Sequence, residues 1–137
     1  MSSVDGSPCF SFSKEVENNA SSVISALTIY ERKEGRAVEL WKHVYPRGDL
    51  PGKLLPADEC IAYDRIAFPD APLLASGRPY NVVMTAAVER DGKLSRRWYE
   101  GNFCMIDASG KPVPHQVLWD KRRKRWAWDQ CGLPAGQ

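Results

Sequence analysis

The chain has 137 residues, of which 43% are hydrophobic and 26% are charged, as in an ordinary soluble protein with one sizeable core. No apolar run reaches the roughly 18 residues that a membrane span needs, which argues against a transmembrane protein. The net charge of +2 indicates no particular partner, but its distribution is uneven: residues 1–87 carry 9 basic against 11 acidic side chains, and residues 88–137 carry 10 against 6.

Three segments in the first half of the chain have the alternating apolar pattern of β-strands. In the second of them, Val38, Leu40 and Val44 share one face. The EGR sequence at residues 34–36 predicts a hairpin turn between the first two segments, and three prolines and two glycines at residues 46–59 predict a long loop before the third. The expected strands cover residues 21–31, 37–45 and 60–68.

The second half of the chain has a cleaner alternation. It begins at Tyr80, and Asp91-Gly92 then predicts a tight hairpin. A further turn is expected at residues 108–110, and a last hairpin is expected around a basic turn. The face that begins with Tyr80 consists of Tyr80, Val82, Met84, Ala86 and Val88. The expected strands here cover residues 80–89, 93–106, 117–120 and 125–130.

Short strands with turn signals between them, and no convincing helix, predict an all-β fold. We expect an Ig-like or fibronectin-like antiparallel β-sandwich of about seven or eight strands with an extra C-terminal hairpin. The chain should form a single domain over residues 1–137, in which residues 1–7 and the tail at 132–137 are flexible.

A leucine, a glycine and a tyrosine recur at intervals of three before the most regular strand, as Leu74-x-x-Gly77-x-x-Tyr80. In Greek-key sandwiches, a tyrosine near the start of strand F bonds through its hydroxyl to backbone a few residues upstream. Glycine allows the tight turn of such a corner, and the leucine packs beneath the ring. We therefore expect a tyrosine corner, and the alternative is a core tyrosine after an ordinary loop.

Four cysteines are spread widely along the chain, and none forms a CxxC pair. With only His43 and His115 beside them, no zinc site is expected, nor any other metal or cofactor. An even number of widely spaced cysteines favours two disulfides and an oxidising compartment, and buried free thiols are the alternative. The cysteines are Cys9, Cys60, Cys104 and Cys131.

Familiar catalytic patterns are absent from the sequence, which has no GxSxG elbow, no HExxH motif and no glycine-rich phosphate loop. Asp58 and Glu59 are adjacent carboxylates in a proline-rich loop, where solvation is the ordinary interpretation. His43 is interpreted as a strand histidine, and His115 as a loop residue. We therefore expect a protein that is not an enzyme and takes no small-molecule ligand, with a small hydrolase as the last alternative.

The most distinctive surface feature is a run of five basic residues, from Lys121 to Arg125, flanked by Trp119, Trp126 and Trp128. Arginine and tryptophan dominate interface energetics, so this run suits a protein partner with an acidic site. The plainer interpretation is a solvated hairpin tip with the tryptophans packed on the sandwich. Binding of nucleic acid is disfavoured because the rest of the chain is not basic.

Several short motifs occur in a characteristic order over roughly residues 8–110. A cysteine precedes the first long strand, a Trp-bearing strand and a proline-rich loop with a second cysteine follow, and a GRPYNV stretch leads into a hairpin. The motifs are Pro8-Cys9-Phe10, Ile29-Tyr30, Leu55-Pro56 with Cys60, and Gly77-Arg78-Pro79-Tyr80-Asn81-Val82. This order resembles that of the periplasmic immunity lipoproteins linked to bacterial type VI secretion.

The resemblance implies a small Ig-like sandwich in the periplasm that binds and neutralises a secreted antibacterial toxin, a type VI effector. It also suggests a Cys9–Cys60 disulfide. No signal sequence or lipobox is visible, so a lipid anchor would belong to an N-terminus that has been removed. The tail from Leu118 to Cys131 has no clear counterpart in the family, and a Cys104–Cys131 bridge is expected from the residues alone.

The leading hypothesis is an immunity protein that binds no nucleic acid and occludes the active site of its toxin with loops and the basic hairpin. Arginine side chains can pair with acidic groups in such a cleft. The alternative is an extracellular or periplasmic sandwich that binds carbohydrate or protein, with Trp119, Trp126 and Trp128 as a stacking platform. The expected partner-binding residues are Arg47, Asp49, Trp119, Arg122, Arg123 and Arg125.

Overall fold

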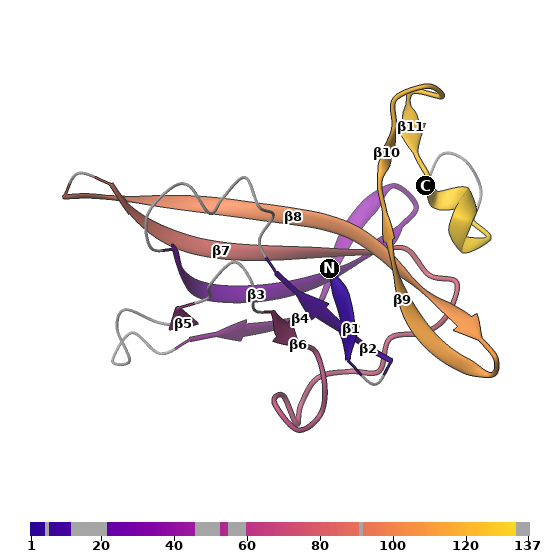
Figure 1. The fold of residues 1–137 in the computed structure, drawn as a ribbon, viewed down its shortest axis with the longest axis horizontal. Helices are drawn as coiled ribbons and strands as arrows, with labels where there is room; N and C mark the ends of the chain where they lie inside the picture. The colour runs from indigo at the N-terminus through magenta and orange to yellow at the C-terminus, as the bar shows by residue number, and fades with distance from the viewer. Residues whose placement is uncertain (5, 12–21, 46–52, 55–59, 91, 134–137) are drawn as a thin grey trace.

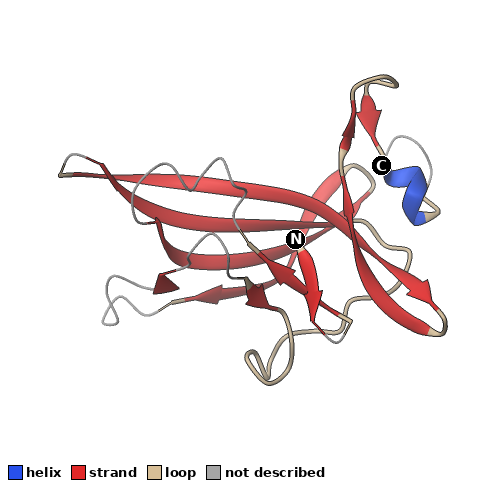
Figure 2. Ribbon diagram, in the orientation of Figure 1, coloured by secondary structure: helices blue, strands red, loops and turns tan. Residues whose placement is uncertain are grey.

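The computed structural model describes residues 1–4, 6–11, 22–45, 53–54, 60–90 and 92–133, and its regular structure is almost entirely β-strand (Figures 1 and 2). The predicted all-β class is therefore confirmed. The strands are β1 (Ser2–Val4), β2 (Ser7–Phe10), β3 (Ser22–Lys33), β4 (Arg36–Val44), β5 (Lys53–Leu54), β6 (Ile61–Ala62), β7 (Tyr80–Arg90), β8 (Lys93–Ala108), β9 (Lys111–Val117), β10 (Trp119–Asp120) and β11 (Arg125–Trp126). A 3-10 helix, η3 (Trp128–Cys131), follows them.

The strands form two layers with the main core between them. The large sheet has the order β4-β3-β7-β8-β9, with β5 beside the start of β3 in a segment where only loop is expected. The small sheet, β1-β2-β6, lies across one face of it (Figure 1), and its first strand falls in the stretch expected to be flexible. The expected antiparallel sandwich is thus confirmed, and β10 and β11 form its extra C-terminal hairpin. The main core includes Phe10, Ile24, Leu27, Ile29, Ile61, Tyr80, Val82, Met84 and Phe103.

Three predicted turns join neighbouring strands of the large sheet. Glu34 and Gly35 link β3 to β4 with φ values of 53° and 77°, and Ser109 and Gly110 link β8 to β9 with φ values of 53° and 83°. Gly92, at φ 75°, lies between β7 and β8. Tight hairpins favour residues with positive φ because such turns match the right-handed twist of the paired strands. The turn residues alone were therefore sufficient to locate these turns, but the return strand β9 (Lys111–Val117) lies, apart from Val117, where no strand is expected.

Three predicted strands are shorter than expected. Of residues 117–120, only Trp119–Asp120 forms the hairpin strand, because Val117 ends β9. Of residues 60–68, only Ile61–Ala62 pairs as a strand, because the chain turns immediately afterwards. The Asp64 carboxylate accepts a hydrogen bond from the Ala67 N–H at 2.7 Å, which closes that turn. At the C-terminus, a strand through residue 130 is also wrong, since the chain enters η3 at Trp128.

The face that the alternation assigns to β4 is wrong. Val38, Leu40 and Val44 are 42%, 37% and 60% exposed, and the buried side chain of this strand is Trp41. The pairing of β4 with β3 skips Leu40, which marks a β-bulge. A bulge exchanges the faces on its two sides, so Val38 and Val44 point to opposite faces of the sheet.

The connection from β6 to β7 carries the chain from the small sheet to the large one, and Tyr80 fixes its end. The Tyr80 side chain is buried and packs against Phe103, with 5.5 Å between the ring centroids. The Ala75 N–H donates to the Tyr80 hydroxyl at 2.7 Å, and this hydroxyl lies 3.3 Å from the Ala75 carbonyl oxygen. Gly77 adopts a φ of 74°, and Leu74 packs against the main core. These are the contacts expected of a tyrosine corner, and burial raises the pKa of the hydroxyl.

Two disulfides, Cys9–Cys60 and Cys104–Cys131, link residues whose Cα atoms are 5.3 and 6.2 Å apart. Both expected pairings are confirmed, and all four cysteines are thereby used. Disulfides persist in oxidising environments, so these bridges favour an extracellular or periplasmic protein. Within the described residues, no helix is both long enough and apolar enough to cross a membrane.

Candidate protein-binding surface

The hairpin β10–β11 stands away from the end of the large sheet, as Figure 1 shows. Its strands pair Trp119 with Trp126 and Asp120 with Arg125. The Asp120 carboxylate accepts hydrogen bonds from two successive backbone N–H groups of the turn, at 3.0 Å each. Lys124 completes the turn in the left-handed region, with a φ of 55°. The basic turn therefore has a defined shape that local hydrogen bonds set.

Arg123 connects this turn to the helix that follows the hairpin. Its guanidinium donates to Asp120 and, from two nitrogens at 3.0 and 3.2 Å, to Asp129 in η3. Hydrogen bonds from the backbone and side chain of Arg123 lower the pKa of Asp120, and side-chain hydrogen bonds from Arg123 lower the pKa of Asp129. The same carboxylates raise the pKa of Arg123. Arg123, expected to contact a partner, thus has internal partners of its own.

A small second core, which we call the C-terminal core, supports the hairpin. Its members surround Trp128, whose side chain is buried. Successive residues of a strand point to opposite faces, so Cys104 lies on the far side of β8 from Phe103 in the main core. The Cys104–Cys131 bridge ties η3 to this outer face. The C-terminal core consists of Cys104, Val117, Ala127 and Trp128.

The three tryptophans of the tail do not form a common platform. Trp128 is buried, whereas Trp119 and Trp126 are 48% and 42% exposed. The two exposed rings meet edge to face, with centroids 5.6 Å apart and planes at 76°. A sugar stacks on a flat aromatic face, so the three-tryptophan platform expected for carbohydrate binding is wrong.

The tip of the hairpin presents positive charge to solvent. Lys121, Arg122 and Lys124 are exposed, Arg125 is half-buried, and none of the four is in an ion pair with the residues that the structure describes. Because two carboxylates already neutralise Arg123, these four side chains set the sign of the local potential. The hairpin surface, as we define it, consists of Trp119, Lys121, Arg122, Lys124 and Trp126.

The other expected contacts cannot be placed beside this surface. Arg47 and Asp49, expected to bind the partner, and the adjacent carboxylates Asp58 and Glu59 all lie outside the described residues. Within the described part of the chain, His, Cys, Asp and Glu side chains form no group of three or more that could hold a metal ion.

Both histidines make structural contacts. His43 is half-buried in an aromatic cluster, with its ring centroid 5.0 Å from that of Phe68 and 4.7 Å from that of Tyr45. His115 lies in β9, which corrects its assignment to a loop, and its Nε2 is 2.8 Å from Oε1 of Gln130. The second contact adds a polar link between β9 and η3, beside the C-terminal core.

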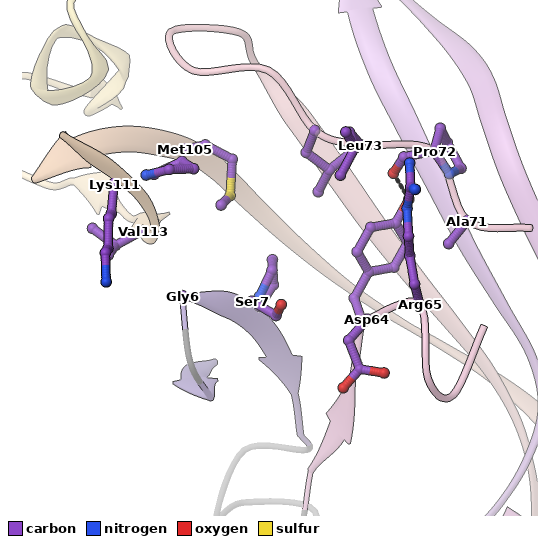
Figure 3. Close-up of a pocket in the computed structure, with 14 residues that line it drawn as sticks. Gly6, Ser7, Asp64, Arg65, Ala71, Pro72, Leu73, Met105, Lys111 and Val113 are labelled. Carbon is purple, nitrogen blue, oxygen red and sulfur yellow. Dashed lines mark hydrogen bonds between the residues drawn. The ribbon is translucent and has the colours of Figure 1, made fainter. Parts of the chain in front are cut away.

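A pocket of about 600 Å³ opens between the start of β2, the start of β9 and the loop after β6. Figure 3 shows Lys111 and Arg65 on opposite sides of it. One wall is held by the Tyr63 hydroxyl, which donates to the Pro72 carbonyl oxygen at 2.6 Å, and burial raises the pKa of this hydroxyl. A pocket of this size can accept an apolar side chain or a small ligand. Its apolar walls include Leu73, Met105 and Val113.

The sequence patterns did not predict several carboxylates that form ion pairs in the structure. Asp120 and Asp129 lie three residues before and six residues after Arg123, a spacing that could have signalled internal pairing. Glu31 is a different case: its side chain is 5% exposed and pairs at 3.1 Å with Arg78, which is 47 residues away. No local pattern can reveal a pair that only the sheet brings together.

Comparison with known proteins does not assign a function to the hairpin surface. Searches of protein-family models, of curated proteins and of solved structures each return no match to the chain. The resemblance to the immunity lipoproteins therefore depends on the short sequence motifs alone. The role of the hairpin surface has to be inferred from its charge, its exposure and its support.

Proposed function

We propose that this chain is a non-enzymatic immunity protein that binds a secreted antibacterial toxin in the periplasm and blocks the toxin's active site. The observation that carries the proposal is the hairpin surface, which projects from the sandwich and combines exposed basic and aromatic side chains. The two disulfides support an oxidising compartment, and the periplasm is one. The sequence motifs support a type VI effector as the toxin.

Rigid support of the hairpin is the first physical argument for binding. The Cys104–Cys131 bridge, the C-terminal core and the two ion pairs of Arg123 order the hairpin before any partner arrives. A surface that is already ordered loses less conformational entropy on association, which leaves more of the contact energy as affinity.

Charge is the second argument. Active sites that use carboxylates as acids, bases or metal ligands are acidic, and a basic hairpin is complementary to such a cleft. Long-range attraction between the two would also speed the encounter. Trp119 and Trp126 can supply the apolar contact area that dominates interface energetics at the base of the tip.

The test begins with co-purification of the chain with the protein encoded by the adjacent gene. If the two associate, the affinity is measured by calorimetry for wild type and for a triple variant, Lys121→Ala with Arg122→Ala and Lys124→Ala. Desolvated charge pairs cost a few kcal/mol each when one partner is removed, so the affinity should fall at least about 100-fold. The melting temperature should stay near that of wild type, because exposed charges contribute little stability.

A matched control removes the same charge at the opposite end of the sheet, with Lys93→Ala, Arg96→Ala and Arg97→Ala on β8. Its affinity should fall far less than that of the hairpin variant. Equal losses would mean that net charge, not the hairpin, attracts the partner. An intact hairpin variant that binds as tightly as wild type would remove the hairpin from the interface and contradict the proposal.

A further inference from the structure

The strand β4 forms one edge of the large sheet and leaves apolar residues exposed there. It stands at the end of the strand order, and its residues 36–40 are all exposed. Val38 and Val44, on opposite faces, are 42% and 60% exposed. The free edge of such a strand carries N–H and C=O groups that can pair with another strand. Alongside the exposed charges of Arg36, Glu39 and Lys42, this edge therefore also carries exposed apolar side chains.

The bulge in β4 gives this edge a specific charge pattern. Glu39 and Lys42 are three positions apart and would lie on opposite faces of a regular strand. The skipped residue, Leu40, brings them to the same face, as their β3 partners Tyr30 and Thr28 show by lying two positions apart. Both charged side chains are exposed, and neither takes part in an ion pair among the described residues.

We infer that two copies of this chain associate through antiparallel pairing of their β4 edges, with Glu39 of each copy opposite Lys42 of the other. A two-fold axis between Leu40 and Trp41 creates this ion pair twice. In the same register, Val38 of one copy lies opposite His43 of the other. Both residues point to the same face of the sheet, so these side chains can also meet.

Two features favour a second copy as the occupant of this edge. The positive and negative charges that pair in the proposed register lie on the same strand, so the edge is complementary to itself, as a two-fold interface requires. A slip of one residue would bring Val38 opposite Lys42, which point to different faces. The hairpin surface has no part in this contact, so the inference is independent of the proposed function.

The test is sedimentation of the full, disulfide-bonded chain over a range of concentrations. Wild type should form a concentration-dependent dimer. Glu39→Lys and Lys42→Glu should each raise the dissociation constant about tenfold or more, because two opposite-charge pairs become two like-charge pairs. An equimolar mixture of the two single variants should associate again, because each variant then supplies the charges that the other lacks.

Two further variants complete the experiment. The double variant Glu39→Lys with Lys42→Glu should dimerise like wild type, since it exchanges the charges within each pair. Glu100→Lys makes the same charge change at an exposed position of β8 and should leave the dimer unchanged. A wild-type chain that stays monomeric at every concentration would overturn the inference. Failure of both the mixture and the double variant to associate would overturn it as well.

Discussion

The main core and the C-terminal core are both closed by a disulfide, but they differ in size and in what surrounds them. Among the described residues, the main core is a cluster of fifteen buried residues between two sheets, whereas the C-terminal core has four on the outer face of the large sheet. The Cys9–Cys60 bridge joins β2 to the residue before β6, and the Cys104–Cys131 bridge joins β8 to a short helix. The first core defines the sandwich, and the second positions one hairpin.

This difference shows how a projecting hairpin can be held in place without being part of the central core. Proteins open in cooperative units of different stability, and a unit with few buried contacts opens first. The disulfide and the ion pairs of Arg123 compensate for the small size of the C-terminal core. We therefore expect the hairpin to behave as a local unit on a more stable sandwich.

Truncation of one fully buried ring in each core should give the largest effects. Phe103→Ala in the main core should lower the free energy of unfolding by about 3–5 kcal/mol, because it leaves a cavity between the sheets. Trp128→Ala should instead open residues 118–133 and leave the sandwich folded. Urea denaturation with amide hydrogen exchange distinguishes the two. If Trp128→Ala destabilises the whole sheet as much as Phe103→Ala does, the two cores are one cooperative unit.

Removal of each disulfide should give the next largest effects. The bridged cysteines are 51 and 27 residues apart, so chain entropy predicts losses of about 4 kcal/mol for Cys9–Cys60 and about 3.5 kcal/mol for Cys104–Cys131. Replacing both cysteines of one bridge with alanine should shift the global melt in the first case. In the second case it should mainly increase hydrogen exchange in the hairpin and weaken partner binding. The reverse pattern would contradict the assignment of each bridge to its core.

The tyrosine corner belongs to the main core and should have a smaller effect. Tyr80→Phe removes the hydroxyl that bonds to Ala75 and should cost about 1–3 kcal/mol in the free energy of unfolding. Tyr30→Phe is a matched control, because Tyr30 is also a strand tyrosine and the hydrogen bonds that tyrosine hydroxyls make to described residues belong to Tyr63 and Tyr80. Equal denaturation midpoints for the two variants would mean that the corner hydrogen bond contributes nothing.

The loss of hairpin stability at acidic pH should be the smallest of these effects. Folding lowers the pKa of Asp120 and Asp129 through Arg123, so their contribution to stability is complete above their unfolded pKa of about 3.9. This contribution to stability should disappear as the pH falls through the lower pKa that each carboxyl has in the folded protein. Arg123→Ala should flatten this dependence in the hairpin and leave the main core unaffected. Tryptophan fluorescence followed over that pH range measures it, and identical titrations for both proteins would argue against the pairs.

Local sequence patterns determined much of the large sheet. The alternation from Tyr80 onward placed β7, and the positive-φ residues located the turns on either side of β8. The spacing of Leu74, Gly77 and Tyr80 predicted a hydrogen bond that spans only five residues. These features depend on neighbours in the chain, so their physical cause is present in a short window of sequence.

Only the tertiary structure decided the features that depend on distant partners. The register of β3 against β4 created the bulge that places Val38 and Val44 on opposite faces and brings Glu39 to the same face as Lys42. Packing of Trp128 against β8 and β9 buries it and so removes it from the expected aromatic platform. The position of η3 also places the Asp129 carboxylate within hydrogen-bonding distance of Arg123. A side chain's exposure and its ion-pair partners are set by whichever strand lies beside it, and a single sequence does not specify that neighbour.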